Sequence, residues 1–83
     1  MQLLYFGWVR TRIGTGSEEI ALPAGIEDVR GLVEWLQSRG QNYLEALREV
    51  ESIRIAVNQE LADLDAPIAG GDEVAVFPPM TGG

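Results

Sequence analysis

The chain ends in Gly71-Asp-Glu-Val-Ala-Val-Phe-Pro-Pro-Met-Thr-Gly-Gly83, and this stretch decides the fold. Residues 73–77 alternate and are rich in β-branched side chains, which predicts a strand with Val74 and Val76 facing inward. Pro78-Pro79 ends that strand, because proline cannot donate a hydrogen bond to a sheet ladder. The sequence therefore predicts a last strand that passes directly into a short tail, residues 78–83.

An aromatic-rich run at the other end of the chain, residues 2–9, predicts a second strand. Alternation divides its side chains between two faces, with Leu3, Tyr5 and Val9 on one and Leu4, Phe6 and Trp8 on the other. Both faces are apolar, which is typical of a central strand. The glycine-containing residues 10–16 then predict a hairpin turn into a strand over residues 17–22.

The middle of the chain predicts one main helix and two further strands. Residues 28–39 carry an apolar stripe at helical spacing, with Asp28 as N-cap and Gly40 as a C-terminal stop. A shorter helix is expected over residues 42–49, with Asn42 and Glu45 resembling a capping box. Strands are expected over residues 53–57 and, at an edge, over residues 60–62.

This order of elements predicts an α+β domain with one main helix on one face of a mixed sheet. A compact solution places the first and last strands side by side and parallel in the middle, which is a β-grasp. The expected core is apolar and comes from every part of the chain: Leu3, Tyr5, Ile20, Leu22, Val29, Leu32, Val33, Leu36, Ile53, Ile55, Val57, Val74 and Val76. The second face of the sheet stays uncovered, with Phe6, Trp8 and Phe77 on it.

Length and composition exclude several function classes. With 83 residues the chain is expected to form a single domain, residues 1–83. It has no cysteine, histidine or lysine, which removes thiolate metal sites, the commonest general base and Schiff-base chemistry. We expect no metal site, no intrinsically bound cofactor and no enzyme activity of the chain by itself.

The charge of the chain points to a protein partner. Thirteen acidic residues against six arginines give a net charge of −7. Such a chain is expected to repel nucleic acid and anionic lipid, and to favour a basic protein. Without a long apolar segment or a signal peptide, a cytoplasmic protein is the default expectation.

The double glycine at the end of the tail indicates chemistry rather than packing. Without side chains, Gly82 and Gly83 can pass through a narrow channel and adopt any φ. Pro78 and Pro79 stiffen the start of the tail. The six residues after Phe77 can extend about 20 Å, at roughly 3.3 Å per residue. The tail is therefore suited to carry a terminal carboxylate into the active site of another protein, although a small, mobile chain end is the plainer interpretation.

The chain resembles the small subunits of molybdopterin synthase along its whole length. The resemblance rests on Leu4-Tyr-Phe-Gly7, Val57-Asn-Gln-Glu-Leu61, Pro67-Ile68 and above all the C-terminal stretch from Gly71 to Gly83. One departure is Trp8, which is larger than the residue expected there. The resemblance implies a β-grasp sulfur carrier of the ubiquitin-like class.

The resemblance also implies roles for particular residues. The carboxylate of Gly83 would be adenylated by an ATP-dependent activating enzyme of the ubiquitin-activating type and converted to a thiocarboxylate. The tail that enters the active site of the large subunit would be Pro78, Pro79, Met80, Thr81 and Gly82. Sulfur would pass to cyclic pyranopterin monophosphate, in a heterotetramer with two small subunits at the ends of a large-subunit dimer. Phe6, Trp8 and Phe77 are the expected docking patch for the large subunit.

Three other functions remain open from the sequence. A thiamine-pathway sulfur carrier would share the fold, the double glycine and the activation chemistry, although Phe77-Pro78-Pro79 fits the molybdopterin branch better. A ubiquitin-like modifier would join Gly83 to lysines of target proteins, but this chain could not form lysine-linked chains on itself. The third is a β-grasp binding module whose tail has no function.

Overall fold

The computed structural model describes residues 1–79, which form a mixed sheet in the order β2-β1-β5-β3-β4. Its strands are β1 (Gln2–Tyr5), β2 (Ser17–Glu19), β3 (Arg54–Val57), β4 (Glu60–Ala62) and β5 (Glu73–Phe77). The predicted α+β architecture with a β-grasp sheet is confirmed. The predicted tail residues Met80, Thr81 and Gly82 and the predicted reacting residue Gly83 lie outside the described residues.

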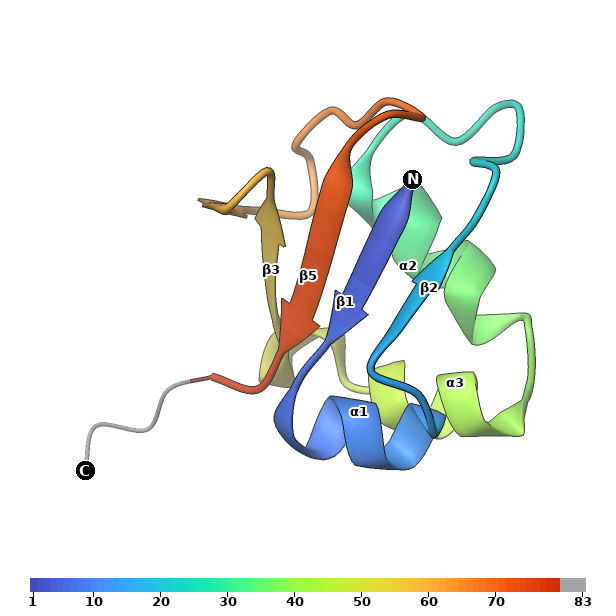
Figure 1. Ribbon diagram of the computed structural model, residues 1–83, viewed down its shortest axis with the longest axis vertical. Coiled ribbons are helices and arrows are strands. Elements are labelled where there is room, and N and C mark those ends of the chain that lie inside the picture. Colours follow the sequence, from blue (N-terminus) through green and yellow to red (C-terminus); the bar gives the residue numbers. More distant parts are fainter. Residues whose placement is uncertain (80–83) are drawn as a thin grey trace.

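The two central strands come from opposite ends of the chain, as predicted. Strands β1 and β5 are parallel, with Leu3 opposite Val74 and Tyr5 opposite Val76. Strand β5 also pairs antiparallel with β3, so it has a hydrogen-bonded neighbour on both sides. The strand that leads into the tail is therefore held in the middle of the sheet (Figure 1).

The predicted strand over residues 2–9 is wrong after Tyr5. The chain leaves the sheet at Phe6 and forms helix α1 (Gly7–Ile13), with Phe6 as its N-cap residue. Gly7 has a φ of +57°, which turns the chain out of the extended conformation. Val9 and Ile13, four residues apart, bury one side of α1. The expected hairpin turn over residues 10–16 is therefore mostly helix, and β2 follows it.

The main helix forms close to its predicted position, as α2 (Val29–Gln37). Asp28 is its N-cap, and the Asp28 carboxylate accepts a hydrogen bond of 2.8 Å from the backbone N–H of Gly31. Gly40 does not end this helix, because Ser38 is the C-cap and Gly40 precedes the next helix, α3 (Gln41–Leu47). A short 3-10 helix, η1 (Val50–Ser52), then leads into β3.

Asn42 does not cap α3, which begins one residue before the predicted start. The side-chain amide of Asn42 instead donates a hydrogen bond of 2.7 Å to the carbonyl oxygen of Ile13, at the end of α1. This contact is tertiary, so a local capping pattern could not reveal it. It ties α3 to the helix that the sequence analysis missed.

The core lies between the sheet and the helices, and most of its predicted members are buried. Ile20, Leu22 and Val57 are only partly buried, because β2 is shorter than predicted and Val57 lies at the end of β3. Five buried residues were not predicted: Val9, Ile13, Ala46, Leu47 and Ile68. Val9 and Ile13 lie on α1, so the missed helix accounts for these two, whereas Ala46 and Leu47 lie on α3, a helix that the sequence did predict.

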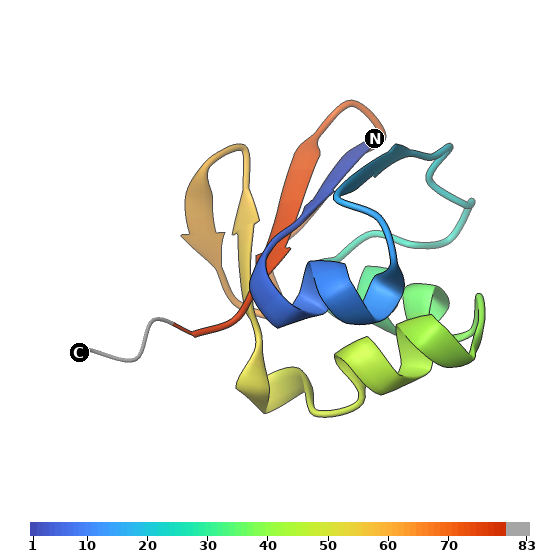
Figure 2. The ribbon, with the colours of Figure 1, turned by 60° about the horizontal axis from the view of Figure 1, so that its bottom comes forward.

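The helices leave one face of the sheet open. Figures 1 and 2 show α2 and α3 on the same side of the sheet, with α1 across the end where β1 and β5 terminate. Among residues 1–79, no helix covers the opposite face. Within that same part of the chain, no helix is long and apolar enough to cross a membrane.

Candidate functional site

The start of the tail is the first part of the candidate site, and the sheet determines its position. Beyond the last register pair of β1 and β5, the backbone N–H of Phe6 donates a hydrogen bond of 3.1 Å to the carbonyl oxygen of Val76. Two residues later, Pro78 lies directly against Gly7. A Cβ added to Gly7 would lie 2.6 Å from Cγ and 2.8 Å from Cδ of Pro78. The first helical turn of α1 and the start of the tail are thus in close contact.

The open face of the sheet is the second part. Leu3 and Tyr5 on β1 and Val74 and Val76 on β5 point into the core, so the residues that alternate with them along each strand point to the open face. These residues and their neighbours on β3 and β4 form the open-face cluster, which consists of Leu4, Ala75, Ala56, Leu61 and Phe77. The register places Leu4, Ala75, Ala56 and Leu61 in one row across four strands, and Phe77 two residues beyond Ala75.

The open-face cluster is exposed at the edge of the sheet and more covered toward its centre. Leu61 on the edge strand β4 is 75% exposed, whereas Phe77 is half-buried beside Arg54 on β3. A row of apolar side chains with one open side is typical of a surface that binds another protein.

The predicted docking patch of Phe6, Trp8 and Phe77 is only partly together. Phe6 keeps an extended backbone, which puts it on the side of Leu4, and its side chain is 49% exposed. Phe77 lies on that face as predicted. Trp8 does not, because it lies in α1 and its neighbours are helical. The strand ends four residues earlier than predicted, at Tyr5, and this removes Trp8 from the sheet.

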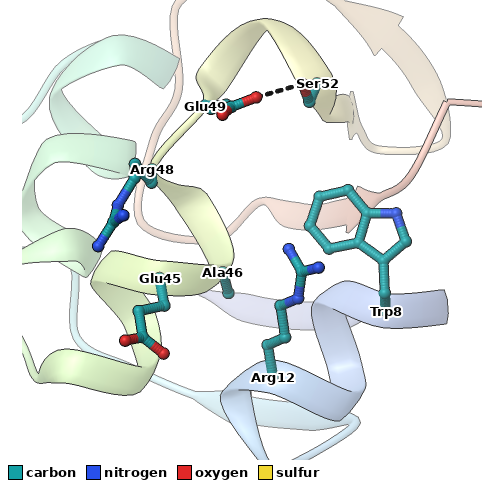
Figure 3. A pocket seen from close by; sticks show the side chains of 7 residues that line it. All are labelled: Trp8, Arg12, Glu45, Ala46, Arg48, Glu49 and Ser52. Atoms are coloured by element: carbon teal, nitrogen blue, oxygen red, sulfur yellow. Dashed lines mark hydrogen bonds between the residues drawn. The ribbon is translucent and has the colours of Figure 1, made fainter.

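Trp8 lies instead at a groove between α1 and the segment from α3 to η1 (Figure 3). The guanidinium of Arg12 stacks 4.4 Å from the centroid of the Trp8 ring, in cation–π geometry. The groove has a volume of about 590 Å³, and the remaining side chains that line it are Glu45, Ala46, Arg48, Glu49 and Ser52. Its two arginines and two glutamates balance in charge, so its lining favours neither an anion nor a cation.

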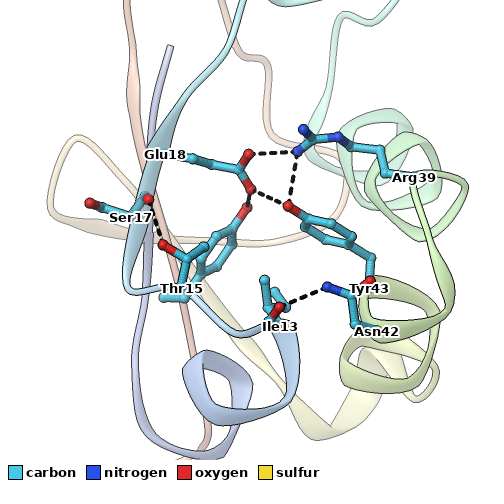
Figure 4. Close-up of polar contacts among 8 residues, drawn as sticks. Ile13, Thr15, Ser17, Glu18, Arg39, Asn42 and Tyr43 are labelled. Atoms are coloured by element: carbon cyan, nitrogen blue, oxygen red, sulfur yellow. Dashed lines mark hydrogen bonds and ion pairs between the residues drawn. The ribbon is translucent and has the colours of Figure 1, made fainter.

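A polar cluster lies on the side of the sheet opposite the open face, and the sequence analysis did not predict it. Glu18 on β2 accepts hydrogen bonds from the hydroxyls of Tyr5 and Tyr43, both of 2.7 Å, and from the guanidinium of Arg39, of 2.8 Å (Figure 4). Tyr5 is 1% exposed, and the Glu18 side chain is 18% exposed. The cluster joins β1 and β2 to the ends of α2 and α3.

The titration of this cluster follows from its hydrogen bonds. Partial burial raises the pKa of Glu18, but the hydrogen bonds from Tyr43, Arg39 and Tyr5 outweigh it and hold the pKa below its ordinary value. Burial and the hydrogen bond to Glu18 raise the pKa of Tyr5. The same two causes raise the pKa of Tyr43. Glu18 is therefore a carboxylate and both tyrosines are neutral donors, which makes the cluster a structural clamp rather than an acid–base pair.

The groups that could hold a metal ion are dispersed over the described part of the chain. No three acidic side chains among residues 1–79 come together as a cation site.

The sequence contained signals for one of the two features that were not predicted, helix α1, but not for the Glu18 cluster. The glycine after Tyr5-Phe6 was a sign of a break in the strand, and Val9 and Ile13 have helical spacing. Nothing local links Glu18 to Arg39 and Tyr43, which are 21 and 25 residues away.

With this geometry in place, the chain can be compared with known proteins. Residues 3–83 match the ThiS family. The chain belongs to the ThiS family. It is 37% identical, over its full length and 99% of the relative, to the molybdopterin synthase sulfur carrier subunit of Escherichia coli K12.

Solved structures of related proteins have the same fold. Molybdopterin converting factor subunit 1 from Pyrococcus furiosus is 33% identical, with a TM-score of 0.76 and 95% of each chain covered. A Helicobacter pylori structure shows subunits 1 and 2 of molybdopterin-converting factor in complex. The matching chain there is 26% identical, with a TM-score of 0.63, and the match covers 99% of this chain and 96% of that one.

A modifier protein also shares this fold. SAMP1 from Haloferax volcanii is 25% identical, with a TM-score of 0.75, and the match covers 100% of this chain and 98% of that one. The fold is therefore shared by proteins named as molybdopterin synthase sulfur carrier subunits or molybdopterin converting factor subunit 1 and by a protein named as a small archaeal modifier.

Proposed function

We propose that this chain is the sulfur carrier subunit of a molybdopterin synthase. The observation that carries the proposal is the full-length similarity to a molybdopterin synthase sulfur carrier subunit, which extends through the C-terminal double glycine. The central position of β5 supports it, because the strand that leads into the tail is paired on both sides and so provides a rigid base for a reacting terminus.

The proposed chemistry takes place on the carboxylate of Gly83. A carboxylate oxygen attacks the α-phosphorus of ATP on the activating enzyme, and pyrophosphate leaves. Sulfide then attacks the acyl carbon of the acyl-adenylate and displaces AMP, which gives a thiocarboxylate. In the synthase, the sulfur passes to cyclic pyranopterin monophosphate and a water oxygen restores the carboxylate. Two such transfers would complete the dithiolene of molybdopterin.

The catalytic groups for these steps are assigned to the partners. The chain has no lysine or histidine, and its six arginines are outnumbered by thirteen acidic residues, so the cations that bind phosphate and pterin would come from the large subunit or the activating enzyme. A carrier with a net charge of −7 suits a basic partner. The Helicobacter pylori complex supports a large-subunit partner, and a heterotetramer is the expected assembly. In it, Pro78, Pro79, Met80, Thr81 and Gly82 would form the tail that enters the active site of the large subunit.

Intact-mass analysis tests the proposal most directly. The chain is produced together with its activating enzyme, and the C-terminal fragment is then located in the mass spectrum. We expect one sulfur in place of one oxygen at Gly83. Protein that keeps its carboxylate, although the activating enzyme is shown to be active under these conditions, would contradict the proposal.

The modifier alternative is separated by the same measurement. Its supporting observation is the similarity to SAMP1, and its expected product is an amide bond between Gly83 and a lysine of another protein. Transfer of the thiocarboxylate sulfur into the dithiolene excludes the modifier alternative. The thiamine-pathway alternative predicts that sulfur goes to a thiazole precursor, so supplying both large-subunit and thiazole-forming partners decides between the two carriers.

Replacing Phe77 by alanine tests the docking surface. Because Phe77 is half-buried on the open face, we expect the free energy of unfolding to fall by only about 1 kcal/mol. We expect binding to the large subunit to weaken by about 2 kcal/mol or more, as for an interface hot spot. Calorimetric titration and thermal unfolding measure the two effects.

The matched control is Leu44→Ala. Leu44 is a large apolar residue that is 38% exposed, and it lies on α3 and not on the open face. It should leave the affinity unchanged. Equal losses of affinity in the two variants would remove the open face as the docking surface.

A further inference from the structure

The contact between Gly7 and Pro78 joins the beginning of α1 to the start of the tail. The Pro78 ring occupies the space that a side chain on Gly7 would need, since an added Cβ would lie 2.6 Å from Cγ of Pro78. Gly7 also has a φ of +57°, where residues with a Cβ are rare. Any other residue at this position would therefore have to change its backbone and displace the ring.

We propose that Gly7 is a positioning residue that sets the direction in which the tail leaves the sheet. By lacking a side chain, Gly7 lets the Pro78 ring lie against its backbone. This contact comes directly after the hydrogen bond between Phe6 N–H and Val76 O, so two successive points fix the start of the tail. The catalytic relevance of that direction rests on the proposed function.

The physical reason lies in the shortness of the tail. Beyond Pro79 only four residues remain before the reacting carboxylate. A proline restricts the rotation of its own φ to about −65°, so a shift of the Pro78 ring is passed on to the residues after it. A misplacement of about 1 Å at a reacting group can cost on the order of a hundredfold in rate. A single backbone contact can therefore influence transfer without contributing a reacting atom.

Gly14 provides a matched control for the conformational cost. It has a φ of +98°, like Gly7 in the left-handed region, but a Cβ there would meet nothing within 4 Å. Gly7→Ala and Gly14→Ala should both lower the melting temperature. Only Gly7→Ala should also move the start of the tail.

The direction of the tail is measured without reference to activity. The chain has no cysteine, so one cysteine at the exposed residue Glu51 takes a single nitroxide label. Paramagnetic broadening of the Met80 to Gly83 amides then reports where the tail lies relative to the label. We expect Gly7→Ala to change this broadening profile and Gly14→Ala to leave it as in the wild type.

A second substitution assigns the effect to the Pro78 ring. Pro78→Ala removes the Cγ and Cδ atoms that an added Cβ would meet. In the Pro78→Ala background, Gly7→Ala should cause no further change in the profile. Pro78→Ala alone should loosen the start of the tail more than Pro79→Ala, which removes an equivalent ring one residue later. This comparison tests the role of the Pro78 ring even if Gly7→Ala does not fold.

Sulfur transfer provides the functional measurement. With thiocarboxylated carrier and saturating large subunit, we expect Gly7→Ala to slow single-turnover transfer by at least about tenfold relative to Gly14→Ala. The dissociation constant for the large subunit should be the same for both. If Gly7 had only a structural role, the transfer rates of both variants would instead fall in proportion to their loss of stability.

The outcomes separate this proposal from the proposed function. Identical broadening profiles for Gly7→Ala and Gly14→Ala, or a Gly7→Ala effect that persists in the Pro78→Ala background, overturn the positioning role. A wild-type chain that acquires no sulfur overturns the proposed function, while the broadening profiles still decide whether Gly7 directs the tail.

Discussion

A chain that ends at Gly82 should fold normally, bind the large subunit and transfer no measurable sulfur. Among residues 1–79 the last buried core residue is Val76, and we expect removal of Gly83 to leave this core unchanged. The deletion withdraws the terminal carboxylate by about one residue, roughly 3.3 Å. Since about 1 Å of misplacement can cost on the order of a hundredfold in rate, transfer should fall below detection.

The measurement is single-turnover formation of dithiolene, with binding and thermal unfolding recorded on the same samples. Adding one residue after Gly83 should be as damaging, because an amide then replaces the carboxylate at that position. Glu51→Gln is the control, since it changes an exposed side chain of η1 outside the tail while keeping the length and the terminal carboxylate. A shortened or extended carrier that forms dithiolene at the wild-type rate would refute the mechanism.

Replacing Glu18 by glutamine should lower the free energy of unfolding by about 2–3 kcal/mol. Glu18 accepts hydrogen bonds from Tyr5, Tyr43 and Arg39, and glutamine replaces one accepting oxygen by an NH₂ group. A donor then faces a donor, and bonds to a charged group are among the stronger ones, at about 1.5–3 kcal/mol each. If the lost bond is that of the buried Tyr5 hydroxyl, a polar group is left unpaired in the core.

Denaturant unfolding measures this loss, with Glu19→Gln as control. Glu19 is the next residue of β2 and is exposed on the opposite side of the strand. Its replacement should change stability by less than about 0.5 kcal/mol. Equal effects of the two substitutions would show that the clamp contributes nothing beyond general surface charge.

The stabilisation from Glu18 should also depend on pH. The pKa of Glu18 is lowered in the folded state, so its contribution is present above the unfolded pKa of about 4.3. As the pH falls through the folded pKa, protonation removes it. The difference in stability between the wild type and Glu18→Gln should therefore be constant near neutral pH and shrink below about pH 4. A difference that grows in acid would contradict the assigned direction of the shift.

The strands at the two ends of the chain were predictable because their signals are local. Residues 73–77 alternate over a full strand, and Pro78 marks their end without ambiguity. The parallel pairing of β1 and β5 also followed, since a short chain with this order of elements has few compact arrangements. The role proposed for Gly83 rests on its position at the end of the tail and on the family resemblance, neither of which depends on tertiary contacts.

The sequence by itself thus determined the fold class, the central pair of strands, the main helix with its Asp28 cap, and the residue on which the chemistry is proposed. Tertiary structure decided where the first strand stops. The run from Phe6 to Val9 is apolar in either conformation, and the burial of Val9 and Ile13 in the core decides between a strand and the helix that their spacing permits. It also decided the Glu18 clamp and the contact of Gly7 with Pro78, because both join residues far apart in the chain. Such contacts depend on how the elements meet in space, and periodicity along a chain carries no information about that.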